Sequence, residues 1–271
     1  MRNPQVAGTF YTSDPEELRA QVKGFFRDAK QSQGTASFII APHAGHEYSG
    51  KTAAYSYSAL EKADTYILIG PNHRGMGNPA AVSMQDFWYT PLGPIQVDRE
   101  LAAKICREPT LTPDEDAHEL EHSIEVQLPF LQEKFDKFKI VPISLAAFGD
   151  PKEAFGFCSR IAASVAKAVK ESNKKVAIIA SSDFSHFISK QAAEKTDKKA
   201  IQKIESLSAK EFLESVLLED LSICGFAPIT VLILAAKELG AKKGKLLHYT
   251  TSADATGDES SVVAYASIIL I

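Results

Sequence analysis

Short apolar runs alternate along this chain with longer segments whose apolar positions recur every three to four residues. The short runs occupy residues 37–40, 66–69, 140–145 and 176–180, and they contain many β-branched residues with little polar alternation. Continuous apolar runs of this kind are typical of central strands that are covered on both faces. The pattern also predicts two strands near the end of the chain, at residues 246–251 and 261–270.

Amphipathic periodicity predicts helices between these strands. The helical patterns cover residues 14–27, 50–60, 98–107, 121–135, 152–170, 190–207, 209–218 and 228–239. No linker or repeat divides the chain, so the alternation predicts one three-layer α/β domain over residues 1–271, with helices flanking the sheet. Only the polar residues 253–259 separate the last two strands, which predicts an antiparallel pair. The central sheet is therefore expected to be mixed and mostly parallel.

Composition narrows the range of partners. The 271 residues carry 30 Lys plus Arg against 34 Asp plus Glu, a net charge of −4 without a basic tract, so nucleic acid is not an expected partner. No apolar run approaches the roughly 20 residues that cross a membrane, and the first residues lack an apolar signal region. Three widely separated cysteines do not make a disulfide framework, which favours a cytoplasmic protein.

Residues suited to chemistry follow directly after several predicted strands. His43 follows in IIAPHAG, His73 in ILIGPNH, and Asp183 and His186 in VAIIASSDFSH. Ligands of open α/β sheets bind at the carboxyl ends of strands, where residues distant in sequence converge. These segments therefore predict one shared site.

His43 and His73 each come shortly after a proline that ends the strand. Two imidazoles from neighbouring strand ends are a natural start for a metal site. The alternative is that each ring caps a helix or bonds a backbone carbonyl.

Asp183 lies three residues before His186. If the turn brings them together, the carboxylate would orient the imidazole and raise its basicity, as a proton-transfer pair requires. The alternative is that Asp183 or Ser185 caps the following helix.

Cys224 stands beside Gly225, just before a predicted helix. A thiol near a helix N-terminus has a lowered pKa and is available to a metal or an electrophile. Cys106 and Cys158 lie inside helical patterns with apolar neighbours, which is typical of packing residues.

The segment DAHELEHSIE contains the His-Glu-x-x-His pattern of zinc hydrolases, formed by His118, Glu119 and His122. Pro113 and the acidic residues after it place His118 at or before the start of the helix, where the two rings need not share a face. We therefore expect His122 to line a substrate pocket. A zinc hydrolase that uses His118 and His122 is the alternative.

Seven segments together resemble the Memo family, the mediator of ErbB2-driven cell motility and its prokaryotic relatives. They are VAGTFYTSDPEEL, APHAGHEYSG, ILIGPNHRG, EHSIEVQLPFL, VPISLA, SSDFSH and ICGFAPI, in the order and spacing of that family. The resemblance implies a fold similar to LigB-type class III extradiol dioxygenases. It further implies that His43, His73 and Cys224 are metal ligands and that His186 is catalytic, with Asp183 beside it.

Two positions depart from the patterns of these families. Cys224 stands where the dioxygenases carry glutamate, and the softer thiolate favours iron(II), copper or zinc. His46 stands where many relatives carry tyrosine, so it could carry protons, add a ligand or line the substrate pocket. We expect the last of these roles.

The sequence thus predicts a metal-dependent redox protein that binds one divalent transition metal, with iron preferred, and acts on an unassigned substrate. The rival is a non-catalytic module that captures a peptide or small ligand, because animal members of the family are described as adaptors for phosphotyrosine peptides. Arg74 alone lies near the motifs, whereas phosphate recognition usually uses an arginine cluster.

The gene context of prokaryotic relatives suggests a third role, shared with radical-SAM and AMMECR-type proteins.

Overall fold

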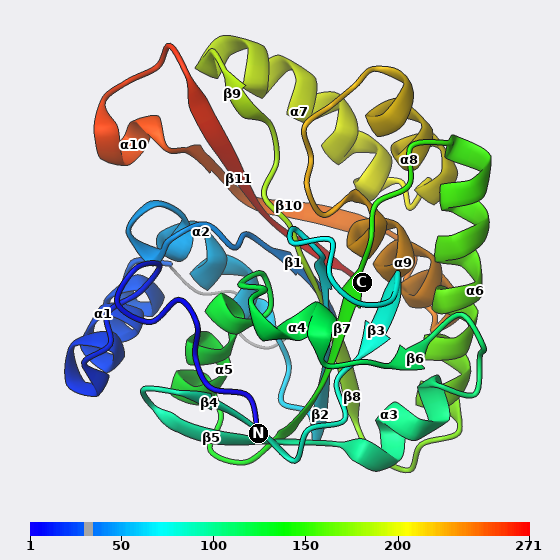
Figure 1. Cartoon of the computed structure of the whole chain (residues 1–271). Helices are drawn as coiled ribbons and strands as arrows, with labels where there is room; N and C mark the ends of the chain where they lie inside the picture. Colours follow the sequence, from blue (N-terminus) through cyan, green and yellow to red (C-terminus); the bar gives the residue numbers. More distant parts are fainter. Residues whose placement is uncertain (30–34) are drawn as a thin grey trace.

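A mixed β-sheet runs through the centre of the molecule, as the computed structural model shows for residues 1–29 and 35–271 (Figure 1). The strand order is β10-β11-β1-β8-β2-β7-β3-β6, with β4, β5 and β9 attached beside this path. The strands are β1 (Phe38–Ala41), β2 (Thr65–Pro71), β3 (Ala80–Val82), β4 (Phe87–Thr90), β5 (Gly93–Val97), β6 (Thr112–Pro113), β7 (Lys139–Leu145), β8 (Val176–Ser181), β9 (His186–Ile188), β10 (Gly244–Thr251) and β11 (Val262–Leu270). The central strands β1, β8, β2 and β7 are parallel, whereas β11 is antiparallel to both β1 and β10. The predicted mixed sheet is confirmed.

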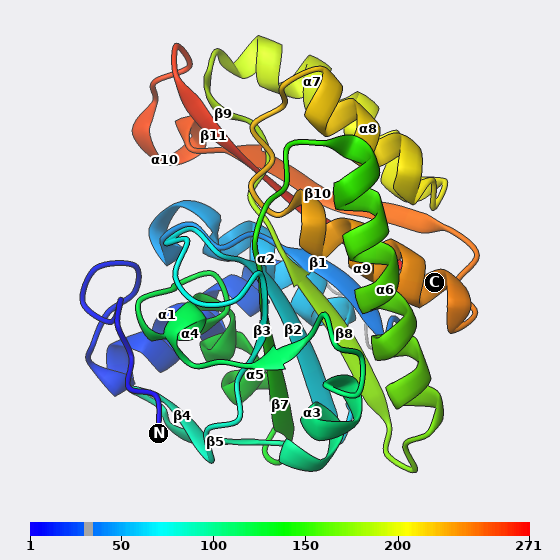
Figure 2. The same ribbon diagram turned by 45° about the vertical axis from the view of Figure 1, so that its right-hand side comes forward.

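Helices cover both faces of this sheet. They are α1 (Pro15–Asp28), α2 (His46–Ala59), α3 (Arg99–Ile105), α4 (Asp116–Glu119), the 3₁₀ turn η1 (Glu125–Gln127), α5 (Leu128–Lys134), α6 (Pro151–Lys170), α7 (Lys190–Glu205), α8 (Ala209–Leu218), α9 (Phe226–Glu238) and α10 (Ala253–Thr256). Helices α1, α2 and α5 lie on one side, and α6, α8 and α9 on the other, as Figure 2 shows after a 45° turn.

Alternation along the central strands divides the apolar side chains between two cores. On β2, Ile67 and Ile69 join the core under α6 and α9, while Tyr66 and Leu68 join the core under α1 and α2. All four side chains are fully buried. The continuous apolar runs therefore reflect a sheet covered on both faces, so the three-layer α/β prediction is confirmed.

Capping residues set several helix boundaries. The Asp14 carboxylate accepts the amides of Glu16 and Glu17, with Pro15 in the first turn. The Lys134 ammonium donates to three carbonyls at the end of α2, those of Tyr57, Ser58 and Leu60.

The structure contradicts one predicted helix and one capping alternative. The helix expected over residues 121–135 is a turn followed by η1 and α5, because Glu121 Oε1 accepts the amides of His122 and Ser123 and holds that turn. The segment after β8 does not lead directly into a helix that Asp183 or Ser185 could cap. Strand β9 intervenes, and Ser189 caps α7 instead.

Within the described part of the chain, every helix is too short or too polar to span a bilayer.

Candidate functional site

The carboxyl ends of the parallel strands gather most of the side chains selected from the sequence. Strand β1 pairs with β8, and β8 pairs with β2, all in the same direction. His43 lies two residues past the end of β1, His73 two past β2, and Asp183 two past β8. Cys224 reaches the same edge from the loop before α9. The site is thus built by one edge of the sheet.

Three imidazoles form the centre of this site. One ring nitrogen of each of His43, His73 and His122 lies within 4.8 Å of the others. The centroids of His73 and His122 are 4.7 Å apart with their planes 20° from parallel, and His43 meets both edge-on. The sequence predicts that His122 lines the substrate pocket, whereas its ring lies inside the imidazole cluster.

Burial keeps two of these imidazoles neutral. His43 is only 2% exposed, and this burial, followed by the nearby His73 ring, holds its pKa well below the usual range. Burial likewise lowers the pKa of His122 to about 4. A neutral imidazole with an unprotonated nitrogen is the form that binds a metal ion.

The Cys224 thiol lies against this cluster, with Sγ 3.2 Å from His43 Nε2. Burial raises the pKa of the thiol, and the Asp183 carboxylate raises it further. A bound cation has the opposite effect, because a coordinating thiol is deprotonated. The structure therefore brings the predicted thiol to one of its predicted partners.

Asp183 and His186 do not form the predicted hydrogen bond among the described residues. Asp183 Oδ1 accepts the amides of His43, at 2.8 Å, and Ala44, at 3.3 Å. The ring of His186 instead bonds through Nδ1 to the Ser222 carbonyl at 2.7 Å, and its amide donates to the Ser222 hydroxyl. The turn after β8 directs the carboxylate back to the end of β1, while the His186 ring at the start of β9 is held by Ser222. Burial raises the pKa of Asp183 to about 6.

His46 fills the core at the start of α2. Its Nε2 lies 2.9 Å from the Val126 carbonyl, and its ring packs against Tyr11, Phe25 and Phe130. Burial lowers its pKa to about 4. Contact of His46 with a substrate stays a prediction.

The zinc-hydrolase arrangement is not formed. Helix α4 ends at Glu119, so His118 and His122 do not share one helix. His118 is buried beside Trp88 with its Nε2 3.2 Å from the Ala81 carbonyl, and it is not part of the imidazole cluster. This geometry disfavours the zinc-hydrolase alternative.

Glu121 is a site residue that sequence analysis did not single out. Its carboxylate bonds to Nδ1 of His73 at 2.9 Å and accepts the amides of His73, His122 and Ser123. Burial alone would raise its pKa, but the hydrogen bond with His73 and the charges of both rings lower it to about 2. The sequence shows acidic residues beside His122. It does not show that Glu121 contacts His73, which lies 48 residues away along the chain.

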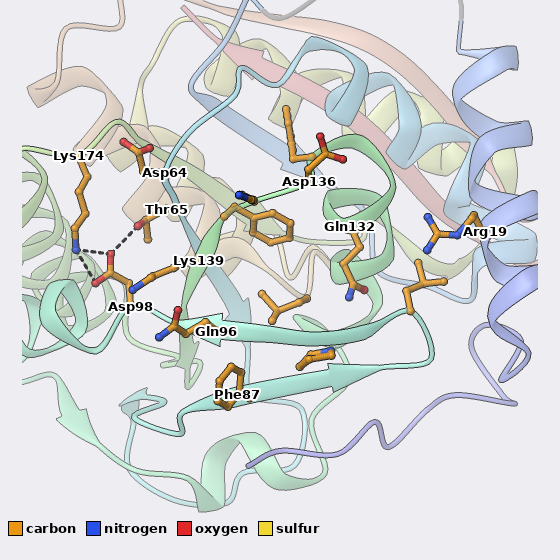
Figure 3. Close-up of a pocket in the computed structure, with 16 residues that line it drawn as sticks. Arg19, Asp64, Thr65, Phe87, Gln96, Asp98, Gln132, Asp136, Lys139 and Lys174 are labelled. Carbon is orange, nitrogen blue, oxygen red and sulfur yellow. Dashed lines mark hydrogen bonds and ion pairs between the residues drawn. The ribbon is translucent and has the colours of Figure 1, made fainter.

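A cavity of about 600 Å³ opens beside His73, His186 and Cys224. Its walls are mainly apolar: Leu145, Val216, Leu217, Leu221, Ile223 and Phe226. A larger cavity, about 910 Å³, lies at the opposite, amino-terminal ends of β2 and β7, where Thr65 and Lys139 begin these strands. Its buried Asp98 is already held by Thr65 and Lys174, as Figure 3 shows. The smaller cavity is the one joined to the histidines.

Together, these features define an α/β protein with imidazoles and a thiol gathered at the carboxyl ends of its central strands. The model of a family described as Memo-like protein matches residues 2–269, and the chain belongs to this family. MEMO1 family proteins of Methanosarcina barkeri and Methanococcoides burtonii are each 43% identical to it over 271 residues, with all of both chains covered. A MEMO1 family protein of Archaeoglobus fulgidus is 41% identical over 269 residues, with 99% of each chain covered.

A solved structure shares the fold. An uncharacterized protein from Escherichia coli K12 superposes with a TM-score of 0.55 at 12% identity, over 86% of this chain and 99% of that one. The family model and the curated relatives confirm the family resemblance predicted from the sequence motifs, whereas the similarity to the E. coli protein concerns the fold alone.

Proposed function

We propose that this protein is a metal-dependent oxidoreductase in which His43, His73 and Cys224 hold one divalent transition metal ion. The observation that carries the proposal is the 3.2 Å approach of Cys224 Sγ to His43 Nε2. His43 itself belongs to a cluster of three histidines whose ring nitrogens lie within 4.8 Å of one another. Two nitrogen ligands and one thiolate suit iron(II), copper or zinc. Iron is preferred because redox chemistry needs a metal that changes oxidation state and keeps open positions.

The donor set fits such an ion. Burial holds His43 in the neutral form, and the Glu121 carboxylate bonds to Nδ1 of His73, which orients that ring with Nε2 free. His122 supplies a third nitrogen within reach. The bound ion would supply the Lewis-acid and redox chemistry, while the apolar walls of the 600 Å³ cavity would hold a substrate and exclude water.

His186 would move the proton. It lines the cavity, and its Nδ1 donates to the Ser222 carbonyl, so Nε2 carries the lone pair that accepts a proton. Asp183 would contribute indirectly, because its carboxylate accepts the amides of His43 and Ala44 and so holds the turn that carries His43.

Anaerobic titration of metal-free protein with iron(II), and separately with a copper salt, tests the proposal. One equivalent should bind to the native protein and to the control Cys158→Ser, whose thiol is buried between α6 and α9. Cys224→Ser and His73→Gln should weaken binding by at least tenfold. Equal affinity and an unchanged spectrum in Cys224→Ser would remove the cysteine from the ligand set.

The rival is a module that binds a peptide or small ligand without catalysis. The residues that line the 600 Å³ cavity include neither lysine nor arginine, which disfavours a phosphotyrosine peptide. Tight binding of such a peptide by protein that binds no metal would reverse this order. A functional link to radical-SAM and AMMECR-type proteins stays a prediction.

A further inference from the structure

A chain of three buried polar side chains lies behind His43, on the side away from Cys224. The Tyr57 hydroxyl is 2.8 Å from Gln127 Oε1, Gln127 Nε2 is 2.8 Å from Ser181 Oγ, and Ser181 Oγ is 2.8 Å from His43 Nδ1. Tyr57, Gln127 and Ser181 are fully buried. They come from α2, η1 and the end of β8, so three separate elements meet behind one imidazole.

The Gln127 side chain has only one possible orientation. Its nitrogen faces the carbonyls of Pro42, at 2.9 Å, and Ala41, at 3.4 Å, and a carbonyl can only accept. The amide NH₂ must therefore be on that side, and the amide oxygen accepts the hydroxyl of Tyr57. Gln127 is thus a donor toward Ser181.

The single hydroxyl hydrogen of Ser181 is also assigned by its surroundings. Ser181 Oγ lies 2.6 Å from the Ser123 carbonyl, and this contact requires the hydrogen of Ser181 because the carbonyl has none. Gln127 donates into one lone pair of Ser181 Oγ, so the other lone pair is left for His43. Nδ1 of His43 must then carry a hydrogen and donate it.

From this bonding pattern we infer that Tyr57, Gln127 and Ser181 are positioning residues that fix His43 in the Nδ1–H tautomer and aim its unprotonated Nε2 at the site. Only one part of the inference rests on the proposed function, namely that Nε2 binds the metal ion. This nitrogen lies 3.2 Å from Cys224 Sγ. Ser181 does for His43 what the Glu121 carboxylate does for His73. A neutral hydroxyl holds the buried ring, and a carboxylate holds the more exposed one.

Nitrogen NMR on metal-free protein tests the tautomer directly. Long-range ¹H–¹⁵N spectra distinguish a protonated from an unprotonated Nδ1, and His43→Gln identifies the His43 signals. The native protein should show Nδ1–H, and Ser181→Ala should shift the ring toward the Nε2–H form. Iron(II) affinity should fall ten- to a hundredfold in Ser181→Ala, the usual effect of losing such an outer hydrogen bond.

Ser144→Ala is the matched control. Ser144 is a fully buried serine on β7, which β2 separates from β8, and its hydroxyl has no hydrogen-bond partner among the described residues. This substitution should leave both the tautomer and the metal affinity at native values.

An Nε2–H tautomer in the native protein would overturn the inference, whether or not Ser181→Ala folds. An unchanged tautomer in folded Ser181→Ala would overturn it as well. If native His43 shows Nδ1–H, Ser181→Ala loses it, and neither protein binds metal, the positioning stands and the proposed function falls.

Discussion

At the scale of single residues, the common feature of the buried histidines is that each is kept neutral. His43, His46 and His118 each have one ring nitrogen bonded to a neutral oxygen, from a hydroxyl or a carbonyl. Burial lowers the pKa of all three. Neutrality suits the proposed role of His43 as a metal ligand. In His46, which packs in the core, it makes the free energy of unfolding depend on pH.

His46→Phe should make the protein less sensitive to acid. The pKa of His46 is about 4 in the folded protein, against an ordinary value of 6.5. Below pH 6.5 the unfolded chain therefore binds a proton at His46 that the folded chain does not bind. The free energy of unfolding therefore falls as the pH falls from 6.5 toward 4, by about 2 kcal/mol between pH 7 and pH 5. Urea unfolding at these two pH values should show that loss reduced by about 2 kcal/mol in His46→Phe.

Tyr48→Phe, an exposed position on the same helix, should keep the native pH dependence. Identical pH dependence in native protein and His46→Phe would show that His46 is not the buried neutral ring described above.

The sequence identified the residues of the site that directly follow strands. His43, His73 and Asp183 were selected because strand ends converge, whereas Cys224 was selected from its place before a helix and from the family resemblance. The structure places all four at one edge of the sheet. Their supporting residues could not be selected, because their roles exist only through contacts with distant segments. Ser181, for example, meets His43 across 138 residues. The Asp183–His186 pairing failed because sequence proximity does not fix the direction of a turn.

At the scale of elements, the junction between β8 and α9 sets the position of Cys224. Gly225 packs against the end of β8, where an added Cβ would lie 2.4 Å from Cβ of Ser182 and 2.5 Å from the Ser181 carbonyl oxygen. The Gly225 amide donates to the Ser182 hydroxyl at 3.0 Å. This close approach holds the cysteine beside the histidines.

Gly225→Ala should push α9 away from β8 and displace the thiol. We expect a loss of about 1–3 kcal/mol in the free energy of unfolding, as for other overpacked sites, together with weaker metal binding. Gly149→Ala is the control, because a Cβ there meets no atom within 4 Å. Native stability and metal affinity in Gly225→Ala would contradict this account of how Cys224 is placed.

Long, buried elements were predictable and short ones were not. The pattern located β1, β2, β7 and β8 within a few residues, because each is a continuous apolar run. Strands β3, β6 and β9 have only two or three residues each, too few for a period to show. The β4–β5 hairpin is also missing from the predicted elements, although β4 alternates in burial. The order of the parallel strands depends on contacts that no local pattern encodes.

At the scale of the whole molecule, the first residues of the chain are tied to the segment that carries His122. Arg2 forms a buried ion pair with Glu125 at 2.8 Å and donates to the carbonyls of His118 and Glu121. The same Glu125 carboxylate accepts the amides of Gln5 and Val6. Figure 1 shows this amino-terminal segment running in front of α5, near α4.

Arg2→Met should therefore destabilise the whole protein. It leaves the Glu125 carboxylate buried without its cation, a change that usually costs about 3–5 kcal/mol. Arg19→Met is the control, since Arg19 pairs with Glu133 through a half-exposed side chain, and exposed pairs contribute about 0–1 kcal/mol. Equal unfolding free energies for the two variants in urea would contradict the role given to the Arg2–Glu125 pair.

The central claim is that a thiolate and imidazoles at one sheet edge hold a redox-active metal. X-ray absorption at the metal edge, on protein purified without oxygen, tests it most directly. We expect about one bound iron or copper per chain, with a sulfur neighbour at about 2.3 Å and imidazole nitrogens at about 2.0–2.1 Å, the distances known for thiolate and histidine ligands of zinc. The sulfur signal should vanish in Cys224→Ser. A native protein that carries no transition metal, or one bound by nitrogen and oxygen alone, would contradict the account.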